Sequence, residues 1–341
     1  MDIQYKVINT EFKYPFTISK GTKTHQPALL VELNHRGIKG LGEAPAISYY
    51  HIPVEKMIED IESKRAMIEA YNLNEPERFW HFLHHAFPGN NFLIAALDIA
   101  AWDIWGKMNG LPLYKFWYKK PFFRTLTDYT LGIDTTEKMV AKLRENPWPV
   151  YKVKLGTAYD IEIIETLRKH TDAPIRIDAN AAWTAEEALE KIGAFEKMNI
   201  ELIEQPLAKD DWQGMKRLME MSKILLIADE SCVEEADVEK CHEHFHGINI
   251  KLTKCGGITP ALRMIDEARN LDMKIMLGSM NEISIGSAAI IHLSCLTDYL
   301  DSDGPLLLHE TGMKGLEIHP DGYFDVPQIP GLGVSTHLFE T

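Results

Sequence analysis

Charged residues recur at a regular spacing through the middle of the chain, each near the end of a short apolar run. They are Lys152, Lys154, Asp178, Glu204, Asp229 and Lys251. From Lys154 onward the successive intervals are 24, 26, 25 and 22 residues, about the length of one strand–helix unit. Because a buried, unpaired charge costs several kcal/mol, charges that end strand after strand indicate a shared chemical site.

Three of these residues are carboxylates on three successive units. Asp178, Glu204 and Asp229 are hard oxygen ligands with no histidine or cysteine beside them, which favours octahedral Mg²⁺ over zinc. Any one of them alone is more simply explained as a strand-end carboxylate bonded to a neighbouring lysine. The three together predict one Mg²⁺ site per subunit, with positions left open for a substrate oxygen.

The lysines have the placement that an inversion of stereochemistry requires. Lys152 and Lys154 lie two residues apart on one strand and therefore point to the same face. Lys251 follows about four strands later and should approach the centre from the opposite side. A carboxylate substrate held between Lys154 and Lys251 would present its α-carbon to a base on one face and an acid on the other. The alternative is that the lysines only neutralise the carboxylates.

The elements that would position these residues follow two patterns. Residues 1 to about 45 alternate polar and apolar, which predicts an antiparallel meander. From Val54 to about Trp117 the apolar spacing becomes helical, and Asn109-Gly110 ends the last helix. We expect residues 1–122 to form an α+β capping domain.

After about Phe123, short β-type runs alternate with amphipathic helical stretches. The runs are TDYTLGI, VYKVKLG, IRIDAN, ELIEQP, LLIADES, INIKLTK, KIMLGSM and YLDSDG. Eight strands with seven helices between them predict a (β/α)7β barrel of the TIM type over residues 123–309, although an open α/β sheet fits the same pattern. Residues 310–341 are too irregular for another unit, and we expect this tail to return to the capping domain.

The motifs YKVKLG, RIDAN, IEQPL, ADES, NIKLTKCGGI and YLDSDGPLL occur in an order that resembles the muconate-lactonizing subgroup of the enolase superfamily. The resemblance covers almost the whole chain. It implies a modified barrel with an N-terminal cap, the three carboxylates as metal ligands, and Lys154 and Lys251 as the acid/base pair. Lys152 would stabilise the ene-diolate that forms on proton removal, and Asn180 and Glu230 would support the metal ligands. Such sites, with a lysine or histidine base and magnesium, are a known pattern of this superfamily.

The reaction within the superfamily must be chosen on residues outside the triad. Asp301 and Asp303 resemble the Asp-x-Asp motif with which dipeptide epimerases hold the α-ammonium group of the substrate. An ammonium group needs anionic acceptors, which lactone and succinylbenzoate substrates do not. We therefore expect an L-Ala-D/L-Glu type epimerase, with peptidoglycan turnover as its setting. The alternatives are a lyase or cycloisomerase of the o-succinylbenzoate synthase or muconate cycloisomerase type, or an N-acylamino acid racemase. Asp301 or Asp303 could also merely cap the following Gly304-Pro305 turn.

The cap should supply the remaining specificity. Lys20 and Lys23 in the loop SKGTKTHQ could meet a second carboxylate, whereas Ala-Glu epimerases place an arginine in this loop, so the second residue of the dipeptide stays open. Ser279 could also touch substrate, and Asn281 and Glu282 are weaker candidates. The histidine runs HFLHH and CHEHFH lie away from the expected barrel mouth, so we interpret them as ordinary surface histidines.

Composition restricts the partners and the location. With 36 basic and 50 acidic residues the formal charge is −14, which disfavours nucleic acid or an anionic membrane. No apolar run approaches the roughly 18 residues of a spanning helix. We expect a cytoplasmic enzyme that acts on a small dipeptide, and homo-oligomers are the common form of such enzymes. A Schiff-base aldolase would not need the metal carboxylates, and a non-catalytic descendant would have lost part of the acid/base set.

Overall fold

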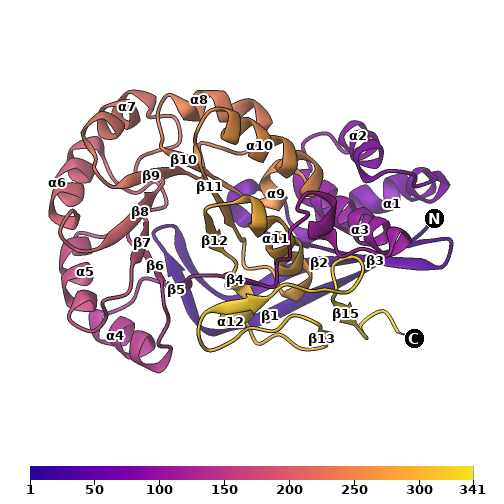
Figure 1. The fold of residues 1–341 in the computed structure, drawn as a ribbon, viewed down its shortest axis with the longest axis horizontal. Helices are drawn as coiled ribbons and strands as arrows, with labels where there is room; N and C mark the ends of the chain where they lie inside the picture. Colours follow the sequence, from indigo (N-terminus) through magenta and orange to yellow (C-terminus); the bar gives the residue numbers. More distant parts are fainter. Residues whose placement is uncertain (341) are drawn as a thin grey trace.

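The computed structural model describes residues 1–340, in which the chain begins with a three-stranded antiparallel sheet. Its strands are β1 (Asp2–Ile18), β2 (Gly21–His35) and β3 (Ile38–Pro45). Burial is continuous over residues 28–33 of β2 and 40–45 of β3, so both faces of this part of the sheet are covered. The tip of the β1–β2 hairpin reaches across the molecule to the barrel, where Thr17 accepts a hydrogen bond from the Ile133 amide at 2.8 Å (Figure 1).

Helices complete the cap. They are η1 (Ser48–Tyr50), α1 (Val54–Ala70), α2 (Pro76–Ala86), α3 (Asn91–Asn109) and η2 (Leu113–Phe116). Helix α3 is apolar around most of its circumference because it lies between the cap sheet and the barrel. At Gly40 and Gly42 a side chain would collide with the α3 backbone, so these glycines allow the helix to pack directly on β3.

Eight parallel strands form the barrel sheet, in the order β5 to β12. They are β5 (Tyr129–Leu131), β6 (Tyr151–Lys154), β7 (Ile175–Asp178), β8 (Ile200–Glu204), β9 (Leu225–Ala228), β10 (Gly247–Ile250), β11 (Lys274–Gly278) and β12 (Tyr299–Asp301). All eight predicted strands are confirmed. The sheet curls into a nearly closed barrel rather than an open sheet, with the helices outside it (Figure 1).

The outer helices follow the strands in sequence order. They are α4 (Thr136–Glu145), α5 (Asp160–Arg168), α6 (Ala185–Phe195), α7 (Trp212–Met221), α8 (Val238–His242), α9 (Leu252–Cys255), α10 (Ile258–Asn270), α11 (Ser284–Leu293) and α12 (Gly304–Leu307), with the short turns η3 (Glu235–Asp237) and η4 (Ser294–Leu296). Local sequence sets their starts: Thr184 and Glu187, for example, form a reciprocal capping box at α6. Within residues 1–340, no helix is long and apolar enough to cross a membrane.

The C-terminal tail contacts both α3 of the cap and the segment at the start of the barrel. It contains the short strands β13 (Met313–Lys314), β14 (Tyr323–Asp325) and β15 (Ser335–Thr336), and β14 pairs with β4 (Arg124–Leu126). The buried carboxylate of Asp103 in α3 accepts hydrogen bonds from the Leu332 amide at 2.8 Å and from the Leu41 amide at 2.9 Å. One cap side chain therefore fixes both the tail and the cap sheet.

Candidate active site

The regularly spaced charges meet at one end of the barrel. Register pairs Lys154 with Asp178 on neighbouring strands, and Asp178 with Glu204 on the next. Asp229 directly follows β9 and Lys251 directly follows β10. Because parallel strands of a barrel end at the same rim, the spacing that the sequence analysis noted becomes a cluster of side chains at that rim.

Each carboxylate of the predicted triad is held from behind on one oxygen. Asp178 Oδ1 accepts the Asn180 amide at 2.9 Å. Glu204 Oε1 accepts the Asn249 side-chain amide at 2.8 Å, and Asp229 Oδ1 accepts Lys254 Nζ at 2.6 Å. All three carboxylates are almost completely buried. Fixed donors on one oxygen leave the other oxygen of each group directed to the centre of the cluster.

The second oxygens meet lysine ammonium groups. Lys154 Nζ lies 2.5 Å and Lys152 Nζ 3.2 Å from Asp178 Oδ2. Lys152 is also 2.7 Å from Glu204 Oε2, and Lys251 is 2.7 Å from Asp229 Oδ2. Three carboxylate oxygens thus share a small volume with three cations, an arrangement that is stable in a dry interior only through such pairing.

The ionisation of the cluster follows from this pairing. Burial alone would raise the pKa of Asp178, but Lys154 and Lys152 hold it below its usual range; Lys251 and Lys254 likewise outweigh burial at Asp229. Burial and the negative charge of Asp178 raise the pKa of Glu204 to about 7. For Lys152, burial is outweighed by Asp301, Glu204 and Asp178, which raise its pKa. Asp178, Asp229 and Lys152 are therefore held in their charged forms, whereas Glu204 titrates near neutral pH.

The donor set fits a hard divalent cation. The three carboxylates offer only oxygen ligands, which Mg²⁺ prefers. In each of Asp178, Glu204 and Asp229, the second oxygen points to a lysine ammonium group, a position that a divalent cation could also occupy. Histidine and cysteine, which would favour zinc, do not contribute to this cluster among the residues described.

The loops that carry these groups adopt strained backbone. Asn180 and Ala181 have φ of 46° and 60°, and Gln205 has φ of 36°, values that ordinary residues seldom adopt. The cost of the Gln205 backbone conformation is offset by its side chain, whose oxygen accepts hydrogen bonds from the backbone amides of Asp229 at 2.9 Å and Ser231 at 3.1 Å. Such conformations persist where the surroundings fix them, and they cluster at functional sites.

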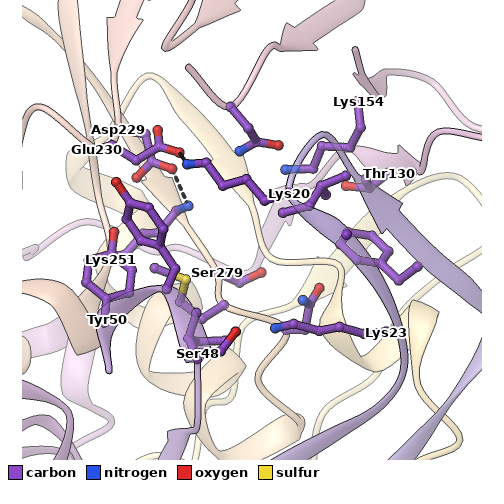
Figure 2. Close-up of a pocket in the computed structure, with 18 of the residues that line it drawn as sticks. Lys20, Lys23, Ser48, Tyr50, Thr130, Lys154, Asp229, Glu230, Lys251 and Ser279 are labelled. Atoms are coloured by element: carbon purple, nitrogen blue, oxygen red, sulfur yellow. Dashed lines mark hydrogen bonds and ion pairs between the residues drawn. The ribbon is translucent and has the colours of Figure 1, made fainter. Parts of the chain in front are cut away.

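A cavity of about 220 Å³ lies between this rim and the cap. The barrel contributes Thr130, Lys154, Asn180, Asp229, Glu230, Lys251, Ser279, Met280, Asn281, Asp301 and Asp303, and the cap contributes Phe16, Ile18, Lys20–Lys23 and Ile47–Tyr50. Figure 2 shows Lys154 and Lys251 on opposite sides of this cavity, as the sequence analysis expected. The cavity is therefore flanked by two amines that can approach one bound molecule from two faces.

The cap lysines differ in their partners. Lys20 Nζ forms an ion pair with Glu230 at 2.8 Å (Figure 2). The same nitrogen lies 4.0 Å from the centre of the Tyr49 ring. Lys23 Nζ reaches only the amide oxygen of Gln26, at 3.4 Å. Burial, together with the nearby charge of Lys154, lowers the pKa of Lys23. Lys23 is thus a cavity cation without a carboxylate partner in the described chain.

Asp301, the last residue of the eighth strand, and Asp303, two residues beyond it, also line the cavity. Asp301 pairs with Lys152 Nζ at 2.6 Å, and Asp303 accepts the Thr130 amide at 2.6 Å. A third buried carboxylate, Asp128, lies behind them and pairs with Arg176 at 2.9 Å. Burial and the charge of Asp301 raise the pKa of Asp303 to about 7. This part of the cavity is suited to a cationic group.

Sequence reasoning located most of the cavity but not all of it. It missed Tyr50, which lines the cavity, and it missed Asn249 and Lys254, which lie outside the cavity and hold Glu204 and Asp229. Lys254 stands in the motif around Lys251, and a lysine in an apolar run is a usable signal. Glu282 is buried against the Met280 amide at 2.6 Å and does not line the cavity. The histidine runs fall on α2 and around α8, outside the residues that line the cavity.

Comparison with known proteins agrees with this architecture. Residues 2–117 match the mandelate racemase / muconate lactonizing enzyme N-terminal domain, and residues 134–338 match the enolase C-terminal domain-like family. An L-Ala-D/L-amino acid epimerase from Maribacter sp. is 46% identical over 98% of this chain and 99% of its own length.

Solved structures give the same result. The substrate-liganded L-Ala-D/L-Glu epimerase of Bacillus subtilis superposes with a TM-score of 0.93 at 28% identity, covering 98% of both chains. A dipeptide epimerase from Cytophaga hutchinsonii, complexed with Mg and D-Ala-L-Val, also gives 0.93 at 28% identity, covering 100% of this chain and 97% of its own. The chain therefore belongs to the mandelate racemase / muconate lactonizing enzyme family of the enolase superfamily, and it is an isomerase of the epimerase class.

Proposed function

We propose that this protein is a Mg²⁺-dependent dipeptide epimerase that inverts the α-carbon of the C-terminal residue. The observation that carries the proposal is the placement of Lys154 and Lys251 on opposite sides of one cavity (Figure 2). Each amine is paired with a carboxylate of the triad, Lys154 with Asp178 at 2.5 Å and Lys251 with Asp229 at 2.7 Å. A 1,1-proton transfer needs this arrangement, because one amine removes the α-proton and the other returns a proton to the opposite face.

In this mechanism Asp178, Glu204 and Asp229 would hold one Mg²⁺ per subunit. When bound, the ion would supply positive charge to stabilise the negative charge that develops on the substrate carboxylate as the α-proton leaves. Lys152 adds a fixed positive charge beside the same carboxylate, since it is 1% exposed and bound to Asp178, Glu204 and Asp301. Lys154 Nζ and Lys251 Nζ exchange the roles of base and acid according to which epimer is bound.

The ammonium group of the dipeptide is assigned to Asp301 and Asp303. Both line the cavity, and the buried carboxylate Asp128 behind them adds to the negative potential. A primary ammonium would satisfy acceptors that a lactone, a succinylbenzoate or an N-acylated amino acid leaves unpaired. This feature favours the epimerase over the lyase, the cycloisomerase and the N-acylamino acid racemase.

The second residue of the dipeptide is assigned an anionic side chain, as in L-Ala-D/L-Glu. Lys23 lines the cavity and has only an amide partner, whereas Lys20 is paired with Glu230. An incoming carboxylate would relieve the buried charge of Lys23. Ser279 lies at the same cavity and can add a hydrogen bond to the substrate. The similar L-Ala-D/L-Glu epimerase of Bacillus subtilis supports this choice.

The setting is proposed from the chain itself. All four cysteines are free, and Cys232, Cys241 and Cys255 are buried. Reduced structural thiols fit the cytoplasm, where dipeptides from peptidoglycan turnover would be the substrates. Assembly into a homo-oligomer stays a prediction, based on how common homo-oligomers are among soluble enzymes.

The test follows the α-proton. The wild-type protein is incubated with Mg²⁺ and L-Ala-L-Glu in D₂O, and proton NMR should show loss of the C-terminal α-proton signal and growth of the diastereomer. Lys154→Ala and Lys251→Ala should each lower epimerisation about 10²- to 10⁴-fold, since each removes one of the two proton-transfer groups. Each variant should retain α-proton exchange with one epimer only, and the two variants should prefer opposite epimers.

Lys216→Ala, on the exposed face of α7, serves as the control and should match the wild type. Undiminished epimerisation in either active-site variant would rule out the two-lysine mechanism. Silence of the wild type toward all dipeptides, with Mg²⁺ bound, would instead favour the lyase.

A further inference from the structure

Lys254 is a buried lysine beside the metal cluster to which no step of the mechanism assigns a role. Its side chain is 1% exposed and does not line the cavity. Nζ donates to Asp229 Oδ1 at 2.6 Å and to the carbonyls of Asp229 at 2.6 Å, Cys232 at 2.8 Å and Asn249 at 3.1 Å. An ammonium group with four acceptors in a dry interior is fixed in place.

The contact selects one oxygen of Asp229. Oδ1 is held by Lys254, which is shielded from the cavity, and Oδ2 is held by Lys251, which lines the cavity. The side chain therefore cannot rotate without breaking the bond to Lys254. Asp229 is fixed with Oδ2 toward Lys251 and the cavity, where the proposed ion would bind.

Lys254 is itself anchored by the cap. It sits in the single-turn helix α9, whose carbonyl groups are bound from outside the barrel: Asn91 Nδ2 donates to the Lys254 carbonyl at 2.7 Å, and Trp80 Nε1 donates to the Gly256 carbonyl at 2.8 Å. Both donors belong to the α2–α3 part of the cap. The position of Nζ thus depends on contacts from two domains.

We propose that Lys254 is a positioning residue that presents Asp229 Oδ2 to the divalent cation and leaves Lys251 free for proton transfer. With Oδ1 retained by Lys254, an ion that takes Oδ2 displaces Lys251 alone, and Asp229 keeps one fixed cationic partner. Without Lys254, the Asp229 carboxylate would keep Lys251 as its only ammonium partner, and the metal site would lose its preorganisation. Outer residues of this kind typically change metal affinity 10- to 100-fold. The inference rests on the proposed magnesium site.

The test measures metal binding without substrate. Mn²⁺ binding is followed by electron paramagnetic resonance for the wild type, Lys254→Met and Lys254→Gln. Met removes the charge and all donors, and Gln restores two donors without charge. We expect the dissociation constant for Mn²⁺ to rise about 10- to 100-fold in Lys254→Met and less in Lys254→Gln.

The matched control is Lys142→Met, which removes an 11% exposed lysine bound to Asp134 at 3.2 Å on the outside of the barrel and should leave Mn²⁺ affinity unchanged. Near-UV circular dichroism checks the fold, and Lys254→Gln carries the test if Lys254→Met does not fold. Wild-type affinity in a folded Lys254 variant would overturn the proposal. Failure of the epimerase proposal would appear separately, as absence of α-proton exchange in a wild type that binds Mn²⁺.

Discussion

At the scale of single residues, the site combines carboxylates of unlike ionisation. Asp301 is paired with Lys152, and its pKa stays low although burial opposes this. Asp303 has no cation at bonding distance among the described residues, and burial beside Asp301 raises its pKa to about 7. A group that titrates near neutral pH in the part of the cavity assigned to the ammonium makes substrate affinity depend on pH.

We predict that the dissociation constant of L-Ala-L-Glu rises as the pH falls below about 7. An acid with a raised pKa takes up its proton below that value, and protonated Asp303 no longer attracts an ammonium group; the limiting slope is tenfold per pH unit. Calorimetry between pH 5.5 and 7.5 measures the effect. N-propionyl-L-glutamate, which lacks the amine, is the control, and an equal pH dependence for both ligands would contradict the assignment of Asp303.

At this scale the sequence was informative because spacing reveals which residues share a rim. It could place Lys154, Asp178 and Glu204 on successive strand ends, since one strand–helix unit has a nearly constant length. It could not reveal that Lys20 is engaged by Glu230 while Lys23 is not, because that difference depends on how the cap hairpin docks. Tyr50 was missed for the same reason.

At the scale of elements, the docking of cap on barrel depends on helix ends. Helix α10 has no side-chain cap of its own, and its N-cap residue is Gly257. The buried carboxylate of Asp98 in α3 supplies the missing acceptor: it accepts the Thr259 amide at 3.0 Å and the Thr259 hydroxyl at 2.7 Å. One helix is thereby capped by another from a different domain.

We predict that Asp98→Ala lowers the free energy of unfolding by about 1–3 kcal/mol, the cost of leaving buried donors unpaired. Asp98→Asn should lose less, because its amide oxygen can still accept one bond. Urea denaturation followed by fluorescence gives both values, and Asp266→Ala on α10 is the control. Equal losses for Asp98→Ala and Asp98→Asn would show that the acceptor oxygen is not the cause.

The elements themselves were predictable to a large extent. All eight barrel strands and the cap meander follow from period-two and buried apolar runs. The sequence left a barrel and an open sheet as alternatives, because curvature arises from strand twist and register and leaves no local pattern. The capping of α10 by Asp98 was likewise invisible, since the two residues that bond are 161 positions apart.

At the scale of the whole molecule, the imidazole of His292 in α11 connects the barrel to both the cap and the tail. His292 Nδ1 accepts the Tyr114 amide at 3.4 Å, and Nε2 donates to the Leu332 carbonyl at 3.1 Å, so the ring is neutral with its proton on Nε2. Burial lowers the pKa of His292 to about 4. The domain limits 1–122, 123–309 and 310–341 stay a prediction. The two hydrogen bonds of His292 connect all three of these segments.

We predict that His292 makes the protein less stable as the pH falls from about 6.5 to about 4. In this window the unfolded histidine binds a proton that the folded one excludes, so stability rises with pH by up to roughly 1.4 kcal/mol per unit. Above about 6.5 the contribution is complete. His292→Gln removes the titration, and the difference between the two urea-denaturation profiles isolates it. Parallel profiles of the two proteins would contradict the assignment.

The bond between Asp103 and Leu332 also sets an order of events during synthesis. The two residues are 229 positions apart, so the buried carboxylate in α3 lacks one of its partners until nearly all of the barrel has left the ribosome. At about 5–20 residues per second this delay is roughly 10–50 s. The part of the chain that is made first is therefore completed last, and a ribosome-bound chain stalled before residue 332 should expose its cap to proteases that the released protein resists.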